Sequence, residues 1–171
     1  MRFIKLFLIG AIVLFFVVTV FSLIFPSNLR ISRAINIAAT REKVWATIDD
    51  LRTWDSWNQF ISLSPLTGKS FSAPSAGTGA FLRSDQLVVK IVRSGPDSIL
   101  IDWDQVNGKP FKGGFNLMQL SPDSLTVQCY LDFRFRWYPW EKFGSMVYDQ
   151  HLGPLMEGSL AGLKRLMENS P

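Results

Sequence analysis

The longest stretch of alternating apolar and polar residues lies at 124–136. Its apolar members occupy every second position: Leu125, Val127, Cys129, Leu131, Phe133 and Phe135. Six such alternations predict a long β-strand with one buried face, because successive side chains of a strand point to opposite sides. A helix would mix the two sets around its circumference, which excludes a helix here. A proline-containing joint follows at 137–140, and a helical pattern then extends to Glu168.

Shorter segments before this strand predict an antiparallel meander. Strands are expected at 31–37, 79–83, 86–93, 98–104 and 111–120, with a brief one at 68–71. Short turn sequences such as Val106-Asn-Gly-Lys109 separate the later strands, and links of this length join antiparallel neighbours. The alternation assigns one set of side chains to the inner face of the sheet: Leu87, Val89, Ile91, Ile99, Ile101, Trp103, Phe115 and Leu117.

Helical spacing marks two further segments. Val44, Ile48 and Leu51 predict a helix that follows Thr40. The C-terminal helix is expected to direct one face toward the sheet: Val147, Leu152, Leu155, Met156, Leu160, Leu163 and Leu166. Pro154 predicts a kink or break near Leu152, since proline cannot donate the backbone hydrogen bond. The whole pattern predicts an α+β domain in which a curved antiparallel sheet of about six or seven strands wraps around a long C-terminal helix.

The N-terminus carries a different signal. No charged residue occurs from Leu6 to Phe25, and these 20 residues would span about 30 Å as a helix, the hydrocarbon thickness of a bilayer. A cleaved signal peptide is the alternative, but its apolar run is about 7–15 residues and ends at a small-x-small site. We therefore expect residues 1–28 to form one transmembrane helix with a short connector, and residues 29–171 to form the folded domain.

The net charge of +4 comes from residues that flank the apolar segment. Arg2, Lys5, Arg30 and Arg33 account for it, and the chain from Ala34 onward has 14 basic and 14 acidic residues. Nucleic-acid binding requires a basic face on the domain, so no nucleic-acid partner is expected. The short basic tail before the apolar run favours a cytoplasmic N-terminus, which would place the domain on the outer, extracytoplasmic side of the membrane.

The order of elements and three local strings are similar to a known superfamily. The string Arg33–Asp50 resembles the opening of polyketide cyclase/dehydrase-like proteins of the SRPBCC superfamily, and Trp54 and Trp57 resemble the tryptophan pair that follows there. The string Gly153–Lys164 resembles the closing helix of these proteins. The resemblance covers residues 31–168 and implies a START-like helix-grip fold with an apolar cavity. Members include lipid carriers, small-molecule binders and aromatase/cyclases, so the resemblance does not select one activity.

Large apolar side chains on the inner face are the candidate ligand-binding residues. The set expected to line the cavity is Leu87, Val89, Ile101, Trp103, Phe115, Leu117, Phe133, Phe135, Met146, Leu155 and Met156. Walls of this kind would bind a flat or aliphatic guest through burial of apolar surface. The competing interpretation is that the same residues fill a closed core.

The sequence offers little catalytic chemistry. His151 is the one histidine, and Cys129 is the one cysteine and is expected to be a core residue. One His and one Cys cannot supply the three or four ligands of a usual zinc site, so neither a metal nor another cofactor is expected. No catalytic residue is assigned, although a cyclase or dehydratase could combine His151 with Tyr130 or Tyr148.

The leading hypothesis is a membrane-anchored, non-catalytic domain that binds a hydrophobic small molecule or lipid. A cyclase/dehydratase-like enzyme is the first alternative. A structural or partner-binding module with a filled core is the second.

Overall fold

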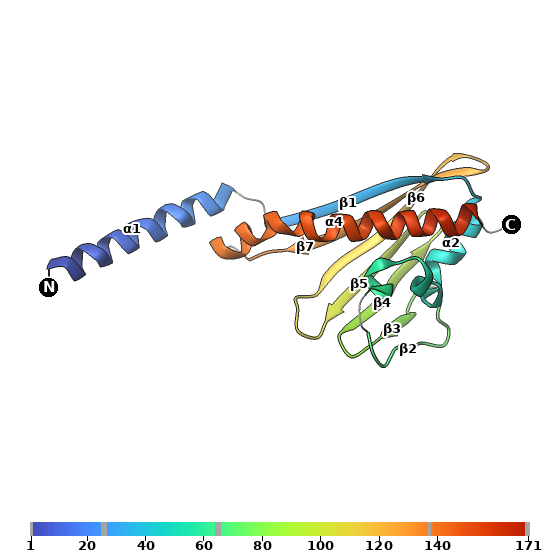
Figure 1. The fold of residues 1–171 in the computed structure, drawn as a ribbon, viewed down its shortest axis with the longest axis horizontal. Coiled ribbons are helices and arrows are strands. Elements are labelled where there is room, and N and C mark those ends of the chain that lie inside the picture. Colours follow the sequence, from blue (N-terminus) through green and yellow to red (C-terminus); the bar gives the residue numbers. More distant parts are fainter. Residues whose placement is uncertain (1, 25–26, 64–65, 137, 170–171) are drawn as a thin grey trace.

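The computed structural model describes residues 2–24, 27–63, 66–136 and 138–169, without the side chains at 23–24, 139–140 and 142–146. Within these residues, seven strands form one antiparallel sheet in the order β1-β7-β6-β5-β4-β3-β2 (Figure 1). The strands are β1 (Asn28–Ile37), β2 (Ser70–Phe71), β3 (Phe81–Arg83), β4 (Leu87–Gly95), β5 (Ser98–Gln105), β6 (Phe111–Ser121) and β7 (Ser124–Arg134). The predicted meander is confirmed, and β1 closes the sheet by pairing with the last strand.

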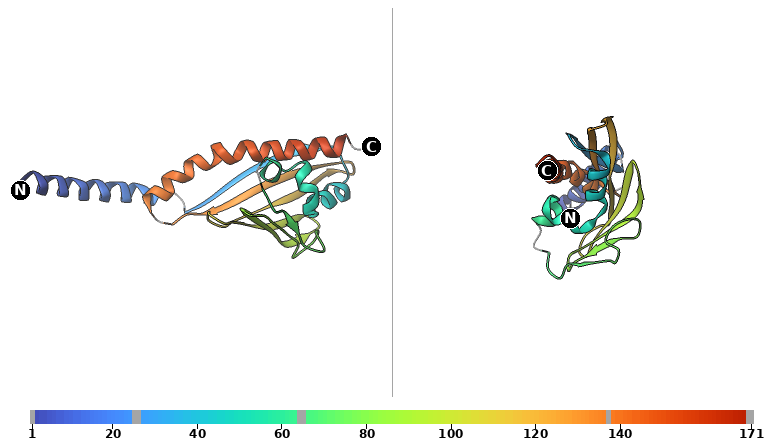
Figure 2. Two further views of the ribbon diagram at one scale, coloured as in Figure 1. Left: turned by 60° about the horizontal axis from the view of Figure 1, so that its bottom comes forward. Right: turned by 90° about the vertical axis from the view of Figure 1, so that its right-hand side faces the viewer.

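The helices of the domain lie on one side of this sheet, and the N-terminal helix extends away from it (Figure 1). They are α1 (Arg2–Ile24), α2 (Arg41–Asp49), the 3-10 helix η1 (Leu51–Ser56), α3 (Gln59–Ser62) and α4 (Pro139–Glu168). The sheet curves, and α4 runs along β1 on its inner side (Figure 2). This is the START-like arrangement that the sequence pattern predicts.

The face assignments of the strands are confirmed. All eight inner-face residues predicted on β4, β5 and β6 are buried, whereas Lys90 and Asp104 on the outer face are exposed. Strand β7 ends at Arg134, two residues before the predicted end. Backbone pairing nevertheless extends one residue further, because the Phe135 amide donates to the Ser27 carbonyl over 2.8 Å.

A kink or a break is predicted near Leu152, and the break is wrong, since α4 continues through Pro154. Figure 2 shows this helix bent but unbroken. Arg33 of β1 holds the turns on both sides of Pro154: its guanidinium lies 2.9 Å from an Asp149 oxygen and 2.7 Å from a Glu157 oxygen. Two ion pairs from one side chain thus help to offset the backbone hydrogen bond that proline lacks.

At Gly162, helix α4 lies close to the backbone of the segment that follows η1. A Cβ atom there would lie 2.7 Å from the Trp57 carbonyl oxygen, which is part of the backbone and cannot swing away. At Gly158, by contrast, an added Cβ would meet the flexible end of the Gln59 side chain. The absence of a side chain at position 162 therefore lets α4 pack this close to the backbone of Trp57, the residue after η1.

Replacing Gly162 with Ala is expected to destabilise the domain. An overpacking cost near 3 kcal/mol exceeds the ~1 kcal/mol gained in helix propensity, which leaves a net loss of about 2 kcal/mol. Urea unfolding of the full chain in detergent, followed by tryptophan fluorescence, measures this loss. Gly158→Ala is the matched control and should change stability by less than about 1 kcal/mol; equal stability of the two variants would contradict the steric argument.

Helix α1 is long and apolar enough to cross a membrane. The segment Arg2–Ser22 has a mean hydropathy of 2.8, although a signal sequence passes the same test of length and composition. The helix ends at Ile24 and β1 begins at Asn28, so chain geometry limits their separation to ~15 Å. We call the end of the domain at which β1 begins the anchor-proximal end, and the opposite end the distal end.

Candidate functional site

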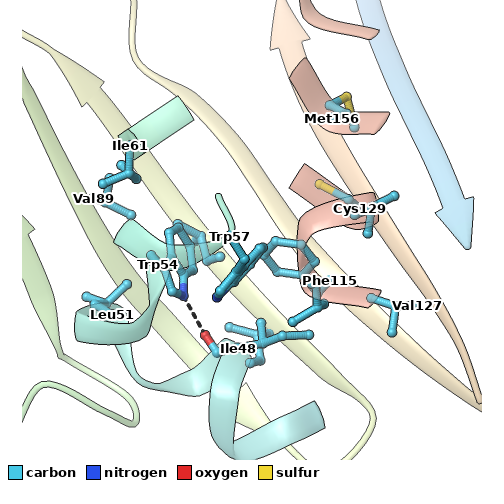
Figure 3. Packing of buried hydrophobic residues seen from close by; sticks show 14 of the residues in the cluster. Ile48, Leu51, Trp54, Trp57, Ile61, Val89, Phe115, Val127, Cys129 and Met156 are labelled. Carbon is cyan, nitrogen blue, oxygen red and sulfur yellow. Dashed lines mark hydrogen bonds between the residues drawn. The ribbon is translucent and has the colours of Figure 1, made fainter. Parts of the chain in front are cut away.

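The distal half of the space between α4 and the sheet is packed. Trp54 and Trp57 lie with ring centroids 5.6 Å apart, and their rings lie 6.0 and 5.8 Å from that of Phe115. The indole nitrogen of Trp54 donates to the Ile48 carbonyl over 2.8 Å (Figure 3). Met156, Leu160 and Leu163 of α4 are also buried. This half is a closed apolar core.

The anchor-proximal half is open. A cleft with a volume of about 930 Å³ lies between the start of α4, the end of β7, the hairpin that joins β5 to β6, and the loop after α3. Its apolar and aromatic lining consists of Phe60, Leu66, Leu87, Trp103, Pro110, Phe111, Phe133, Phe135, Val147, Tyr148, Leu152 and Leu155. The space between α4 and the sheet is therefore filled in its distal half and open in its anchor-proximal half.

A continuous series of aromatic rings forms one wall of the cleft. Trp103 stacks on Phe111 with centroids 5.7 Å apart and an interplanar angle of 8°. Phe111 lies 4.8 Å from Phe133, whose ring meets Tyr148 of α4 edge-on at 4.9 Å. Phe135 contacts the same tyrosine at 5.3 Å. The rings connect the sheet to the helix and present an apolar surface with defined geometry.

Polar groups of the cleft belong to its rim. They are Gln86, Gln105, Asn107, Lys109, Arg134 and His151. Lys109 lies 2.7 Å from a carboxylate oxygen of Glu141, and this hydrogen bond holds the pKa of Glu141 below its ordinary value. Nδ1 of His151 lies 3.0 Å from the Val147 carbonyl, so it carries the hydrogen and leaves Nε2 as the acceptor of the neutral ring.

The expected cavity residues divide between the cleft and the core. Those that line the cleft are Leu87, Trp103, Phe133, Phe135 and Leu155. Those buried among the core side chains, outside the cleft lining, are Val89, Ile101, Phe115, Leu117 and Met156. The side chain of Met146 lies outside the part of the chain that the structure describes.

Sequence reasoning missed several cleft residues. Phe111 stands in register with Trp103 on the inner face, so the alternation that identified Trp103 also carried the signal for Phe111. Val147 and Tyr148 are the first cleft-lining residues of α4 whose side chains the structure describes. Val147 was expected to face the sheet, but 45% of its surface is exposed at the cleft. Phe60 lies on the four-residue helix α3, too short for any periodic signal.

This geometry, a curved antiparallel sheet that grips a long helix beside an apolar cleft, agrees with a family comparison. The sequence model of the family described as polyketide cyclase / dehydrase and lipid transport matches residues 28–168. The chain belongs to this family. The resemblance of its local strings to polyketide cyclase/dehydrase-like proteins is thereby confirmed. No curated protein matches the sequence significantly.

Solved structures of the START type are similar over nearly the whole domain. A START superfamily protein from Mycobacterium smegmatis has a TM-score of 0.60 and 18% identity, over 82% of this chain and 97% of that one. A truncated norcoclaurine synthase from Thalictrum flavum has a TM-score of 0.61 and 11% identity, over 84% of this chain and 96% of that one. Structural similarity at such low sequence identity establishes the fold of this family member but not its activity.

The side chains in the cleft that were considered as proton donors or acceptors come from a single helix. His151 and Tyr148 both line the cleft, and both belong to α4. Tyr130 lies on the outer face of β7, where the Arg30 guanidinium sits 4.7 Å from the centre of its ring. The three side chains considered for a cyclase or dehydratase therefore do not surround one site.

Cys129 is a core residue. Burial raises the pKa of its thiol to about 12, so the thiol stays protonated at neutral pH and is a poor nucleophile. Within the described ranges, no group of three or more His, Cys, Asp or Glu side chains is placed to hold a metal ion.

Proposed function

We propose that this chain is a membrane-anchored member of its family that binds a hydrophobic small molecule or lipid in the anchor-proximal cleft, without catalysing a reaction. The observation that carries the proposal is the cleft itself. Its volume of about 930 Å³ falls within the ~300–1,000 Å³ typical of ligand sites, and most of its lining is apolar or aromatic.

Burial of apolar surface supplies the binding energy in this proposal. A guest that buries about 200 Å² of apolar surface gains roughly 5 kcal/mol before the entropic cost of binding. The aromatic wall favours a flat or chain-like guest, because its rings present an extended and mostly apolar surface. The alternative of a module with a filled core fits the distal half of the domain only.

Helix α1 supports a location at a membrane. Its apolar segment would hold the domain at the bilayer surface, and the basic residues Arg2 and Lys5 before it favour the outer side for the domain. A hydrophobic ligand is most concentrated in the bilayer, so it would travel only a short distance to a binding domain that is fixed at the bilayer surface.

Native mass spectrometry of the full chain, purified in mild detergent, tests this function. The expected spectrum contains a species heavier than the protein by one small apolar molecule, and acid unfolding releases that molecule for identification. Repeated preparations without a bound species, combined with no uptake of added fatty acids, alcohols or sterols, would refute the proposal.

A further inference from the structure

The charged residues in the described lining of the cleft are cations. This lining includes Lys109 and Arg134 but no aspartate or glutamate. A cleft bounded by cations and by low-dielectric walls raises the local concentration of anions. An apolar interior with a cationic rim is the complement of an amphiphile whose polar end is negatively charged.

Arg134 is the rim cation that remains available. Lys109 is paired with Glu141 at 2.7 Å. Asp132, the nearest acid along β7, already accepts two hydrogen bonds of 2.6 Å from Arg30. Within the part of the chain that the structure describes, the exposed Arg134 side chain has no carboxylate partner. Its guanidinium is therefore free to bind an anionic group.

The position of Arg134 places it near the membrane surface. It pairs with Asn28, the first residue of β1, which the chain holds within ~15 Å of the end of α1. Arg134 also borders a second hollow of about 710 Å³, whose lining holds charges of both signs, namely Arg30, Lys90, Lys112, Asp102, Asp104 and Asp132. Because Arg134 is exposed and also lines the cleft, a head group bound to it would stay in contact with water while its chain enters the cleft.

We propose that the cleft binds an acyl-chain amphiphile with an anionic head group, drawn from the bilayer that holds α1, and that Arg134 binds the head group. This rests on the proposed function and specifies its ligand class. The chain lies against Phe133, Tyr148 and Leu155, and the charge-assisted hydrogen bonds of the guanidinium select carboxylate or phosphate over a neutral head.

Two probes of equal chain length, palmitate and hexadecanol, test the head-group assignment with the full chain in detergent. Arg134→Gln is expected to weaken palmitate binding about tenfold and to leave hexadecanol binding within twofold of the unchanged protein. Arg134→Lys should recover part of the loss. Arg83→Gln, an exposed arginine on β3 outside the cleft, is the matched control and should bind both probes normally.

The possible outcomes distinguish a failure of the head-group assignment from a failure of the proposed function. Binding of neither probe by the unchanged protein would refute the proposed function. Equal binding of the two probes, or an Arg134→Gln variant that binds palmitate normally, would overturn the role of Arg134 and leave the proposed function standing.

The source of the ligand has its own test. The full chain is reconstituted in phosphatidylcholine vesicles, and nitroxide-labelled fatty acid is supplied either in the same bilayer or on albumin outside. Quenching of tryptophan fluorescence reports entry, because Trp103 lines the cleft. Faster quenching from the same bilayer is expected; uptake from albumin alone would overturn the bilayer source.

Discussion

Leu155→Trp is expected to remove ligand binding while the fold remains intact. Leu155 is half-buried on α4 and lines the cleft, so a larger indole at this position occupies the space of the guest. Because the new side chain extends into open space, the overpacking cost should stay below about 1.5 kcal/mol. We expect at least tenfold weaker binding, measured as the bound fraction in native mass spectrometry, with urea unfolding as the test of stability.

Val92→Trp is the control for this experiment. Val92 lies on β4 outside the cleft lining and is 37% exposed, so the same increase in size there should leave binding unchanged. Full retention of the bound molecule by the Leu155→Trp variant would show that the ligand lies elsewhere.

Trp54→Ala is expected to produce the largest loss of stability. Trp54 is fully buried, its indole donates to the Ile48 carbonyl over 2.8 Å, and its ring packs against Trp57, Trp103 and Phe115. Removal of an aromatic side chain from such a site costs about 3–5 kcal/mol, which is a large part of the free energy of unfolding of a domain. Urea unfolding followed by circular dichroism measures the change.

Trp45→Ala provides the comparison. Trp45 is half-buried on α2 at the margin of the core, and its removal should cost clearly less. A Trp54→Ala variant as stable as Trp45→Ala would mean that the distal core does not determine stability.

The fold could be predicted from the sequence because its signals are local and repeated. The alternation at 124–136 gave the correct face for Phe133 and Cys129, and short turns gave the antiparallel order. The local pattern around Pro154 predicted a break wrongly, because it does not show the tertiary contacts of α4: Arg33, more than a hundred positions away in sequence, forms ion pairs with the turns on both sides of the proline.

The candidate site could be predicted only in part, since periodicity identifies a face but not what lies opposite it. Val89 and Leu87 alternate on the same inner face of β4, but Leu87 borders the cleft and Val89 is sealed in the core. The difference comes from Trp54 and Trp57, in and directly after η1, which fill the distal half of the space between α4 and the sheet. No pattern within β4 carries that information.

The three-residue link between α1 and β1 also limits how any bound molecule can travel. With α1 embedded, a domain on so short a tether cannot shuttle cargo across an aqueous compartment as a soluble carrier does. Exchange would occur at one fixed height above the membrane, through lateral diffusion and direct encounter with neighbouring molecules in two dimensions.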